Sequence, residues 1–136
     1  MCGICGEIRF NKSKIDSVKA EHMLQSIKSR GPDHKGSYLH KNIFLGHRRL
    51  SILDTSSFGH QPMFADDGKL VLVFNGEIYN YKELRSDLKR KGFVFQGESD
   101  TEVLLKLYLS EGKEMLPKLN GIFTFAILDI NSELLF

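Results

Sequence analysis

The sequence predicts an α+β fold whose sheet is mostly antiparallel. Three observations lead to this prediction: strand-like segments open the chain and fill its middle, two segments with helical periodicity lie between later strands, and the last residues resemble a hairpin. The chain has 136 residues, the size of one domain, and shows no internal repeat, low-complexity tract or linker. We therefore expect one domain over residues 1–136.

The first strand and the first helix are expected near the N-terminus. Residues 4–10, ICGEIRF, are interpreted as a strand on weak period-2 alternation that includes Phe10. Residues 18–29 follow a helical period, and we expect their core face to consist of Val18, Met23, Leu24 and Ile27. The segment RGPD at 30–33 ends this helix, because proline disfavours helical geometry in the residue before it.

The middle of the chain is rich in strand signals. Strands are expected at 36–40, at 42–54 and, after the turn-forming DDG, at 69–80. The second of these carries Arg48 and Arg49, which point to opposite faces because side chains alternate along a strand. One guanidinium should therefore face the interior or a cleft, where it needs a carboxylate from the protein or from a ligand.

A second helix is expected over residues 81–92. Asn80 and Glu83 resemble a capping box at its start, and Gly92 is expected to end it. The helical period turns Leu84 and Leu88 towards the core.

Another helix and a hairpin complete the pattern. Ser99 and Glu102 repeat the capping device before a helix at 103–112, whose core face is expected to hold Val103, Leu104, Leu107 and Tyr108. Residues 122–130 and 133–136 are interpreted as the two strands of a terminal hairpin.

Composition argues against several classes of partner. The net charge of +2 is spread over 19 basic and 17 acidic residues without a long run of one sign, so no nucleic-acid or membrane surface is expected. No apolar stretch approaches the ~18 residues of a membrane-spanning helix, and the N-terminus lacks the pattern of a secretory signal. The cytoplasm is the expected location.

The opening MCGICGEIRF raises three interpretations of its two cysteines. A redox Cys-x-x-Cys pair normally begins a helix after a strand, whereas this pair precedes a strand. Half of a zinc site would need a second cysteine pair, which the sequence lacks, so no metal site is expected. The third interpretation makes Cys2 an N-terminal nucleophile and Cys5 a buried strand residue.

Chemistry favours the nucleophile. A small residue after Met1 generally permits removal of the methionine, which would leave Cys2 with both a thiol and a free α-amino group. That amine has a pKa of about 7.7–8.0 and can accept the thiol proton near neutral pH. His47 is the alternative base, although a strand histidine more often has a packing or hydrogen-bonding role.

Three further segments could complete an amide-cleaving site. Asn75-Gly76 follows a hydrophobic strand and offers an amide donor beside an unobstructed backbone N–H, although the pair alone is more typical of a hairpin turn. One of the two arginines could hold a substrate carboxylate. Asp100 at a helix start is best explained by N-capping when taken alone, but it could also receive an ammonium group.

Together these segments resemble the glutaminase domain of glutamine-hydrolysing asparagine synthetases, which are class II, N-terminal-nucleophile amidotransferases. The resemblance rests on seven motifs in order: MCGI at 1–4, RGPD at 30–33, GHRRLSILD at 46–54, GHQPM at 59–63, NGEIYNYKELR at 75–85, SDTEVLL at 99–105 and LNGIFTFAILD at 119–129. Glucosamine-phosphate synthases and phosphoribosylpyrophosphate amidotransferases share the opening cysteine and the NG motif but, as a rule, not RLSILD, GHQPM or NGEIYNY.

The resemblance assigns roles by position. Cys2 corresponds to the nucleophile and its amino group to the base, Asn75 and Gly76 to the oxyanion hole, and Arg49 to the group that binds the glutamine α-carboxylate. Glu77 and mainly Asp100 correspond to residues that hold the α-amino group, and backbone carbonyls near Leu50 and Ile52 also bind substrate. Arg30 and Asp33 lie in a motif that shapes the site, without an assigned chemical role.

The resemblance also implies an architecture and partners. The expected fold is an Ntn-type four-layer sandwich, with two antiparallel β-sheets between helical layers, and the domain is expected to be incomplete at its C-terminus. L-glutamine is the implied substrate, and glutamine hydrolysis needs no cofactor. ATP and Mg²⁺ are expected only in an absent synthetase domain, where the ammonia would amidate aspartate.

Two questions stay open at this point. The chain could instead be a non-catalytic pseudo-glutaminase or interaction module, or it could serve a related amidotransferase with another ammonia acceptor. Oligomeric state has no sequence signature, and a homodimer is one option.

Overall fold

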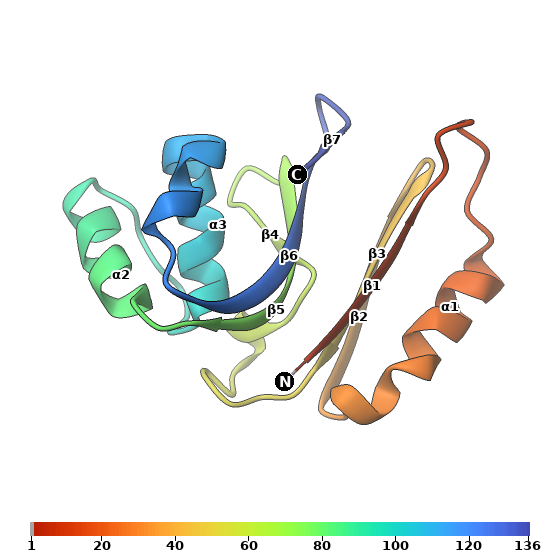
Figure 1. Ribbon diagram of the computed structural model, residues 1–136, viewed down its shortest axis with the longest axis horizontal. Helices are drawn as coiled ribbons and strands as arrows, with labels where there is room; N and C mark the ends of the chain where they lie inside the picture. Colours follow the sequence, from red (N-terminus) through yellow and green to blue (C-terminus); the bar gives the residue numbers. More distant parts are fainter. Residues whose placement is uncertain (1) are drawn as a thin grey trace.

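The computed structural model describes residues 2–136 and shows four layers, in which two β-sheets face each other and helices cover their outer surfaces (Figure 1). Every strand pair in both sheets is antiparallel. The predicted α+β sandwich is therefore confirmed. Among residues 2–136, no helix is both long and apolar enough to cross a membrane.

The first sheet contains three strands in the order β1-β3-β2, with β1 at Gly3–Ile8, β2 at His34–His40 and β3 at Ile43–Arg49. Helix α1, Ser17–Ser26, covers its outer face. The side chain of Asp16 begins this helix by accepting the backbone N–H groups of Val18 and Lys19. A short 3-10 turn over Lys28–Arg30 then leads into β2.

The second sheet has the order β4-β5-β6-β7, with β4 at Met63–Phe64, β5 at Leu70–Ile78, β6 at Gly121–Asp129 and β7 at Leu134–Leu135. Helices α2, Tyr81–Arg90, and α3, Asp100–Glu111, cover its outer face (Figure 1). Further 3-10 turns lie at Ser57–Gly59 and Gly112–Lys118. The predicted hairpin is confirmed by the pairing of Leu128 with Leu135.

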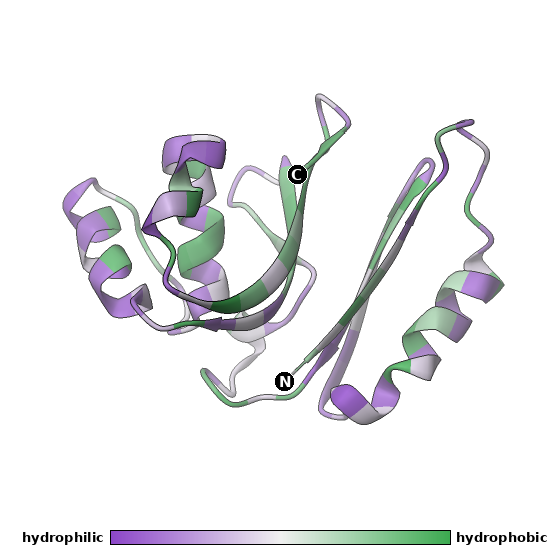
Figure 2. Ribbon diagram, viewed as in Figure 1, coloured by the Kyte–Doolittle hydropathy of each residue, from purple (hydrophilic) through white to green (hydrophobic). Residues whose placement is uncertain are grey.

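Alternation along β5 separates two of the three core clusters. Val71 and Val73 pack between the sheets, whereas Leu72 and Phe74 pack towards α2 and α3. A third cluster, with Leu24 at its centre, fills the space between α1 and the first sheet. Figure 2 shows hydrophobic colour concentrated along the strands and on the inward sides of the helices. Both faces of each sheet are thus covered.

Several local predictions differ from the structure. Val18 is 62% exposed, and Ala20 and Leu24 are the buried residues of α1, so the predicted face is rotated. Phe10 lies beyond the end of β1 and is 91% exposed. The predicted strand 42–54 ends at Arg49, after which the chain leaves the sheet.

The capping box predicted at α2 does not form. The amide of Asn80 instead donates to the Lys118 carbonyl at 2.8 Å and accepts the Asn120 N–H at 3.0 Å, which joins two loops. At α3, Ser99 accepts the Glu102 N–H at 3.2 Å as predicted, but the Glu102 carboxylate accepts the N–H groups of Gln96 and Gly97, each at 2.9 Å, so only half of the capping box forms. The helix begins earlier than expected, at Asp100.

Candidate active site

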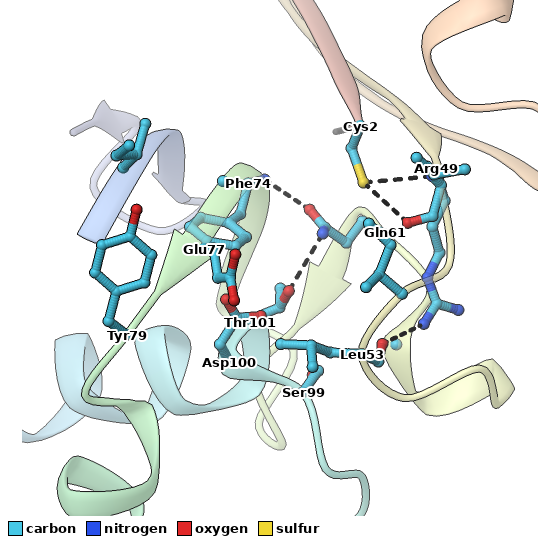
Figure 3. A pocket seen from close by; sticks show the side chains of 15 residues that line it. Cys2, Arg49, Leu53, Gln61, Phe74, Glu77, Tyr79, Ser99, Asp100 and Thr101 are labelled. Atoms are coloured by element: carbon cyan, nitrogen blue, oxygen red, sulfur yellow. Dashed lines mark hydrogen bonds between the residues drawn. The ribbon is translucent and has the colours of Figure 1, made fainter. Parts of the chain in front are cut away.

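A pocket of about 300 Å³ opens beside the N-terminal end of β1 (Figure 3). It is bordered by the loop after β3, by the last part of β5 and by the start of α3. All of the predicted site residues except Asn75 line it: Cys2, Arg49, Leu50, Ile52, Gly76, Glu77 and Asp100. These positions are spread over nearly a hundred residues of sequence, and the fold brings them to one cavity.

Cys2 presents its thiol to the pocket from the edge of the first sheet. The Leu50 N–H donates to Cys2 Sγ at 3.4 Å, and the Leu50 carbonyl oxygen lies 3.6 Å from the same sulfur. The Arg30 side chain donates to the Cys2 carbonyl oxygen at 3.1 Å. The backbone and the thiol of Cys2 are thus both held in place. The predicted removal of Met1 concerns a residue outside the described range 2–136.

Cys5 occupies a different environment. Both cysteines are free thiols, and Cys5 packs in the cluster between the first sheet and α1, against Leu24 and Phe44. Burial raises the pKa of the Cys5 thiol, although the positive charge of Arg48 acts in the opposite direction. Cys5 is only partly buried, so the prediction of a buried strand residue is met in part: the residue packs against this cluster but keeps some exposure.

The two adjacent arginines are both buried, and they face opposite sides of β3. Arg48 donates to the Leu24 carbonyl at 3.1 Å and to the side chain of Gln25 at 2.9 Å, on the α1 side. Arg49 lines the pocket and is 4% exposed. Its guanidinium donates to the carbonyl oxygens of Ser56, at 2.8 Å, and of Leu53 and Asp54.

The acceptors around Arg49 are neutral carbonyl oxygens. Within residues 2–136, no carboxylate forms a salt bridge with this guanidinium. The carbonyl groups thus hold the guanidinium in place but do not neutralise its positive charge. A buried cation without a carboxylate partner favours binding of an anionic ligand group. Gly59 permits this packing, because a Cβ there would lie 2.0 Å from a guanidinium nitrogen of Arg49.

Asn75 and Gly76 lie inside β5 and not in a hairpin turn. Asn75 shares the strand face of Val71 and Val73, which points to the first sheet, but it is half-buried and does not line the pocket. Its side-chain oxygen has no hydrogen-bond partner within residues 2–136. Gly76 does line the pocket, where a Cβ would lie 2.4 Å from the Ile122 carbonyl oxygen.

Asp100 is the first residue of α3 and is 5% exposed. The helix is capped by Ser99, which leaves the Asp100 carboxylate free to accept the Ile78 N–H at 3.0 Å. Burial raises the pKa of Asp100, hydrogen bonds from backbone N–H groups lower it, and the nearby charge of Glu77 raises it further. Glu77 itself is exposed at the pocket.

His47, the alternative base, does not line the pocket. Its side chain is fully buried, and its Nε2 atom lies 3.1 Å from the Phe74 carbonyl oxygen. Burial lowers the pKa of His47 to about 4, so the imidazole is neutral near pH 7. This placement indicates a structural hydrogen bond between the two sheets.

Comparison with known families identifies the chain. Residues 1–136 match the family described as "Glutamine amidotransferase domain". The chain belongs to this family.

Asparagine synthetases are among the relatives of this amidotransferase domain. The "Asparagine synthetase [glutamine-hydrolyzing] 1" of Bacillus subtilis is 41% identical over 141 residues, which cover 100% of this chain and 22% of that protein. The "Putative asparagine synthetase [glutamine-hydrolyzing] 2" of Methanocaldococcus jannaschii is 40% identical, with 100% and 29% covered. The amidotransferase domain thus spans about a fifth to a third of the length of these relatives.

A solved structure supports the fold of the amidotransferase domain. The glutamine phosphoribosylpyrophosphate amidotransferase of B. subtilis, complexed with ADP and GMP, has a TM-score of 0.56 and 28% sequence identity. The similarity covers 68% of this chain and 22% of that one. It confirms the expected Ntn-type amidotransferase sandwich.

The amidotransferase pocket also contains residues that sequence reasoning did not assign. They are Leu53, Gly59, Gln61, Phe74, Tyr79, Ser99, Thr101 and Ile122. Gln61 lies within the GHQPM motif, which carried the resemblance without a role for any of its residues. Within residues 2–136, no cluster of three His, Cys, Asp or Glu side chains is placed to hold a metal ion.

Proposed function

We propose that this domain hydrolyses L-glutamine to glutamate and ammonia, with Cys2 as the nucleophile. The observation that carries the proposal is the position of the Cys2 thiol in a pocket that also contains a buried, unneutralised Arg49 and the Asp100 carboxylate. Glutamine has an anionic α-carboxylate, a cationic α-ammonium and a reactive carboxamide. The pocket offers a group of matching chemistry for each of the three.

The proposed reaction begins when the α-amino group of Cys2 takes the thiol proton. The sulfur then forms a bond to the carboxamide carbon, and the carbonyl oxygen becomes an oxyanion that the Asn75 amide and the Gly76 N–H stabilise. When the tetrahedral intermediate collapses, the C–N bond breaks and the ammonium of Cys2 gives its proton to the departing ammonia. Water hydrolyses the remaining γ-glutamyl thioester to glutamate and restores the thiol.

Substrate orientation is assigned to two charged groups. Arg49 binds the α-carboxylate, and Asp100, with a smaller contribution from Glu77, binds the α-ammonium group. The backbone carbonyls near Leu50 and Ile52 provide further acceptors. This hydrolysis uses no cofactor, because Cys2 supplies both the nucleophile and the base.

In a longer protein of the asparagine synthetase type, the ammonia would pass to a second domain and amidate aspartate in an ATP- and Mg²⁺-dependent reaction. The support for this assignment is the similarity to glutamine-hydrolysing asparagine synthetases, of which the chain covers only a part. A cytoplasmic location and a homodimer stay predictions.

The test is release of glutamate and ammonia from L-glutamine by the purified chain and by Cys2→Ala and Cys2→Ser variants. We expect equimolar products from the unaltered chain, with an intact mass one methionine residue lower than the translated sequence. Both variants should fold and be inactive. Cys2-independent ammonia release, or activity with Met1 retained, would refute the mechanism.

A further inference from the structure

The strand that carries Gly76 has one incompletely paired edge. Backbone N–H and C=O groups of successive residues in an antiparallel strand point alternately to its two neighbours. Strand β6 pairs with β5 along its whole length, but β4 pairs only with Val71 and Leu72. The backbone N–H and C=O groups of Phe74, Gly76 and Ile78 point to the β4 side, but β4 does not extend far enough along β5 to bond to them.

Side chains occupy this edge on both sides of Gly76. The Phe74 N–H donates to Gln61 Oε1 at 2.6 Å, and the Ile78 N–H donates to Asp100 Oδ2 at 3.0 Å. Gly76 lies midway between these two residues, so its N–H points to the same edge, where it lines the pocket. Within residues 2–136, neither a side chain nor a loop carbonyl accepts a hydrogen bond from it.

Gln61 connects this edge to helix α3. Its side chain is buried, with 4% of the residue exposed, and its Nε2 atom donates to Thr101 Oγ1 at 3.3 Å (Figure 3). Thr101 follows Asp100 in the first turn of α3. One buried amide thus links the strand that carries Gly76 to the helix that carries the Asp100 carboxylate.

The carbonyl group of Phe74 is held from the opposite sheet. His47 Nε2 lies 3.1 Å from this oxygen, and His47 belongs to β3, two residues before Arg49. The peptide groups of Phe74 are therefore fixed by two side chains, one from the loop before β4 and one from the first sheet. Both contacts act on the residue directly before Asn75-Gly76.

We propose that Gln61 is a positioning residue, which sets the Gly76 N–H at the distance and direction needed to bind the oxyanion. The inference rests on the proposed function. Gln61 does not react. It accepts the hydrogen bond of the Phe74 N–H, so that the Gly76 N–H, the next one on the same edge, stays directed into the pocket. Loss of this hydrogen bond leaves the Phe74 N–H without its acceptor on the β4 side, so the backbone that leads to Gly76 can shift locally while β5 stays paired with β6. Small displacements of catalytic groups strongly reduce rate.

The central variant is Gln61→Met, which keeps the length of the side chain but removes both hydrogen bonds. We expect kcat for glutamine hydrolysis to fall about 10- to 100-fold, which is less than complete loss of an oxyanion donor. KM should change less than kcat, because Gln61 bonds to Phe74 and Thr101 and not to Arg49 or Asp100, and the lost positioning of the Gly76 N–H acts in the transition state. Gln61→Glu keeps an oxygen for the Phe74 N–H and should recover most of the lost kcat.

A second readout separates positioning from general damage. An aldehyde analogue of glutamine, L-glutamate γ-semialdehyde, reacts with the thiol: the sulfur bonds to the aldehyde carbon, and the aldehyde oxygen receives the thiol proton. The hemithioacetal places that oxygen where the oxyanion forms. The affinity of the Gln61→Met variant for this aldehyde should fall by the same factor as its kcat/KM for glutamine. Gln96→Met, at an exposed glutamine outside the pocket, is the matched control and should behave like the unaltered chain.

The outcomes distinguish the two proposals. If the unaltered chain hydrolyses glutamine and Gln61→Met retains its kcat and its aldehyde affinity, the role of Gln61 is wrong while the proposed function stands. If the unaltered chain releases no ammonia, the proposed function fails, and this inference with it. If Gln61→Met does not fold, Thr101→Val is used in its place. We expect Thr101→Val to lower kcat and Thr101→Ser to restore it. An unchanged kcat in Thr101→Val would overturn the inference.

Discussion

The carboxylate of Asp100 accepts a hydrogen bond from the backbone N–H of Ile78 at 3.0 Å. This contact joins the first turn of α3 to the free edge of β5. It uses one carboxylate oxygen and holds the side chain at the pocket, where the acid can meet a cationic group. Asp100 is thus both a structural acceptor and the proposed ligand for the substrate ammonium.

Replacing Asp100 with asparagine separates these two roles. An asparagine retains an oxygen for the Ile78 N–H but loses the charge. Since a hydrogen bond to a charged group contributes about 1.5–3 kcal/mol, we expect KM for glutamine to rise about 10- to 100-fold, with a smaller effect on kcat. Initial-rate kinetics provides the measurement. An unchanged KM would show that Asp100 does not contact the substrate.

The pH dependence of Asp100 offers a related measurement. Burial raises the pKa of this carboxyl, so it takes up a proton at a higher pH than an exposed aspartate does. Protonation removes the charge that binds the ammonium group. KM should therefore rise as the pH falls towards the raised pKa, and Asp100→Asn should lack this component of the profile.

Arg49 should contribute mainly to substrate binding. Arg49→Lys keeps the charge but cannot reproduce the planar set of donors that reaches the carbonyl groups of Ser56 and Asp54. We expect a higher KM with a smaller change in kcat. Gly59→Ala provides a matched variant, because its methyl group would displace the Arg49 guanidinium without altering its charge. Should either variant lower kcat at constant KM, the carboxylate assignment would be wrong.

The two cysteines should differ in reactivity. Burial raises the pKa of Cys5, which lowers its thiolate fraction near neutral pH, whereas Cys2 lines the open pocket. Iodoacetamide should therefore label Cys2 first and abolish activity, and glutamine should protect the enzyme. Peptide mass spectrometry identifies the labelled site. Cys5→Ala should retain activity; preferential labelling of Cys5 would contradict this order.

His47 should make stability depend on pH. Its pKa is about 4 in the folded protein and about 6.5 when exposed, so between these values the unfolded chain binds more protons. The stability that the neutral imidazole contributes is fully present above pH 6.5 and is lost as the pH falls to about 4. Over this interval the free energy of unfolding should change by about 3 kcal/mol, at ~1.36 kcal/mol per pH unit.

Urea unfolding of the chain and of His47→Gln between these pH values tests this prediction. Glutamine keeps a donor for the Phe74 carbonyl but does not titrate. The difference in unfolding free energy between the two proteins should shift by about 3 kcal/mol in favour of the variant as the pH falls. A pH-independent difference would mean that the histidine is not held neutral in the fold.

The position of Gly76 leaves no room for a side chain. A Cβ would lie 2.4 Å from the Ile122 carbonyl oxygen and 2.5 Å from Phe123 Cα, both on the paired strand β6. Gly76→Ala should push β5 away from β6, lower stability by about 1–3 kcal/mol and reduce kcat by displacing the N–H. Thermal unfolding and steady-state kinetics measure the two effects. A fully active, equally stable variant would contradict the packing.

Much of the candidate site could be predicted from residue types and their order. A cysteine behind the initiator methionine, an Asn-Gly pair after an apolar strand and an arginine pair within a strand are compatible with amide cleavage, although the Asn-Gly pair alone is more typical of a hairpin turn. Period-2 alternation correctly predicted that Arg48 and Arg49 lie on opposite faces of their strand. Seven motifs in order then gave the family and its sandwich fold, which the family match and the solved amidotransferase structure confirm.

Local patterns failed where a distant group supplied the competing contact. Asn80 lies before a helix as a capping residue would, but its amide joins the loops around Lys118 and Asn120 instead. Strand β3 ends at Arg49, earlier than predicted, because the residues after Arg49 pair with neither β1 nor β2. Leu50 and Ile52 form part of the pocket wall instead. Neither outcome has a signature within a few residues of sequence.

By itself, the sequence determined which residues carry reactive or charged groups and the order of helices and strands, because both depend on residue type and short-range periodicity. Only the tertiary structure decided which of those groups meet. It placed the Cys2 sulfur against the Leu50 backbone, surrounded Arg49 with neutral carbonyls and paired Gln61 with the edge of β5. The Cys2 and Gln61 contacts join segments 48 and 13 residues apart, and the Arg49 contacts need the loop after β3 to turn back over the guanidinium. They form because two sheets bury their apolar faces together and fix the loops at their ends.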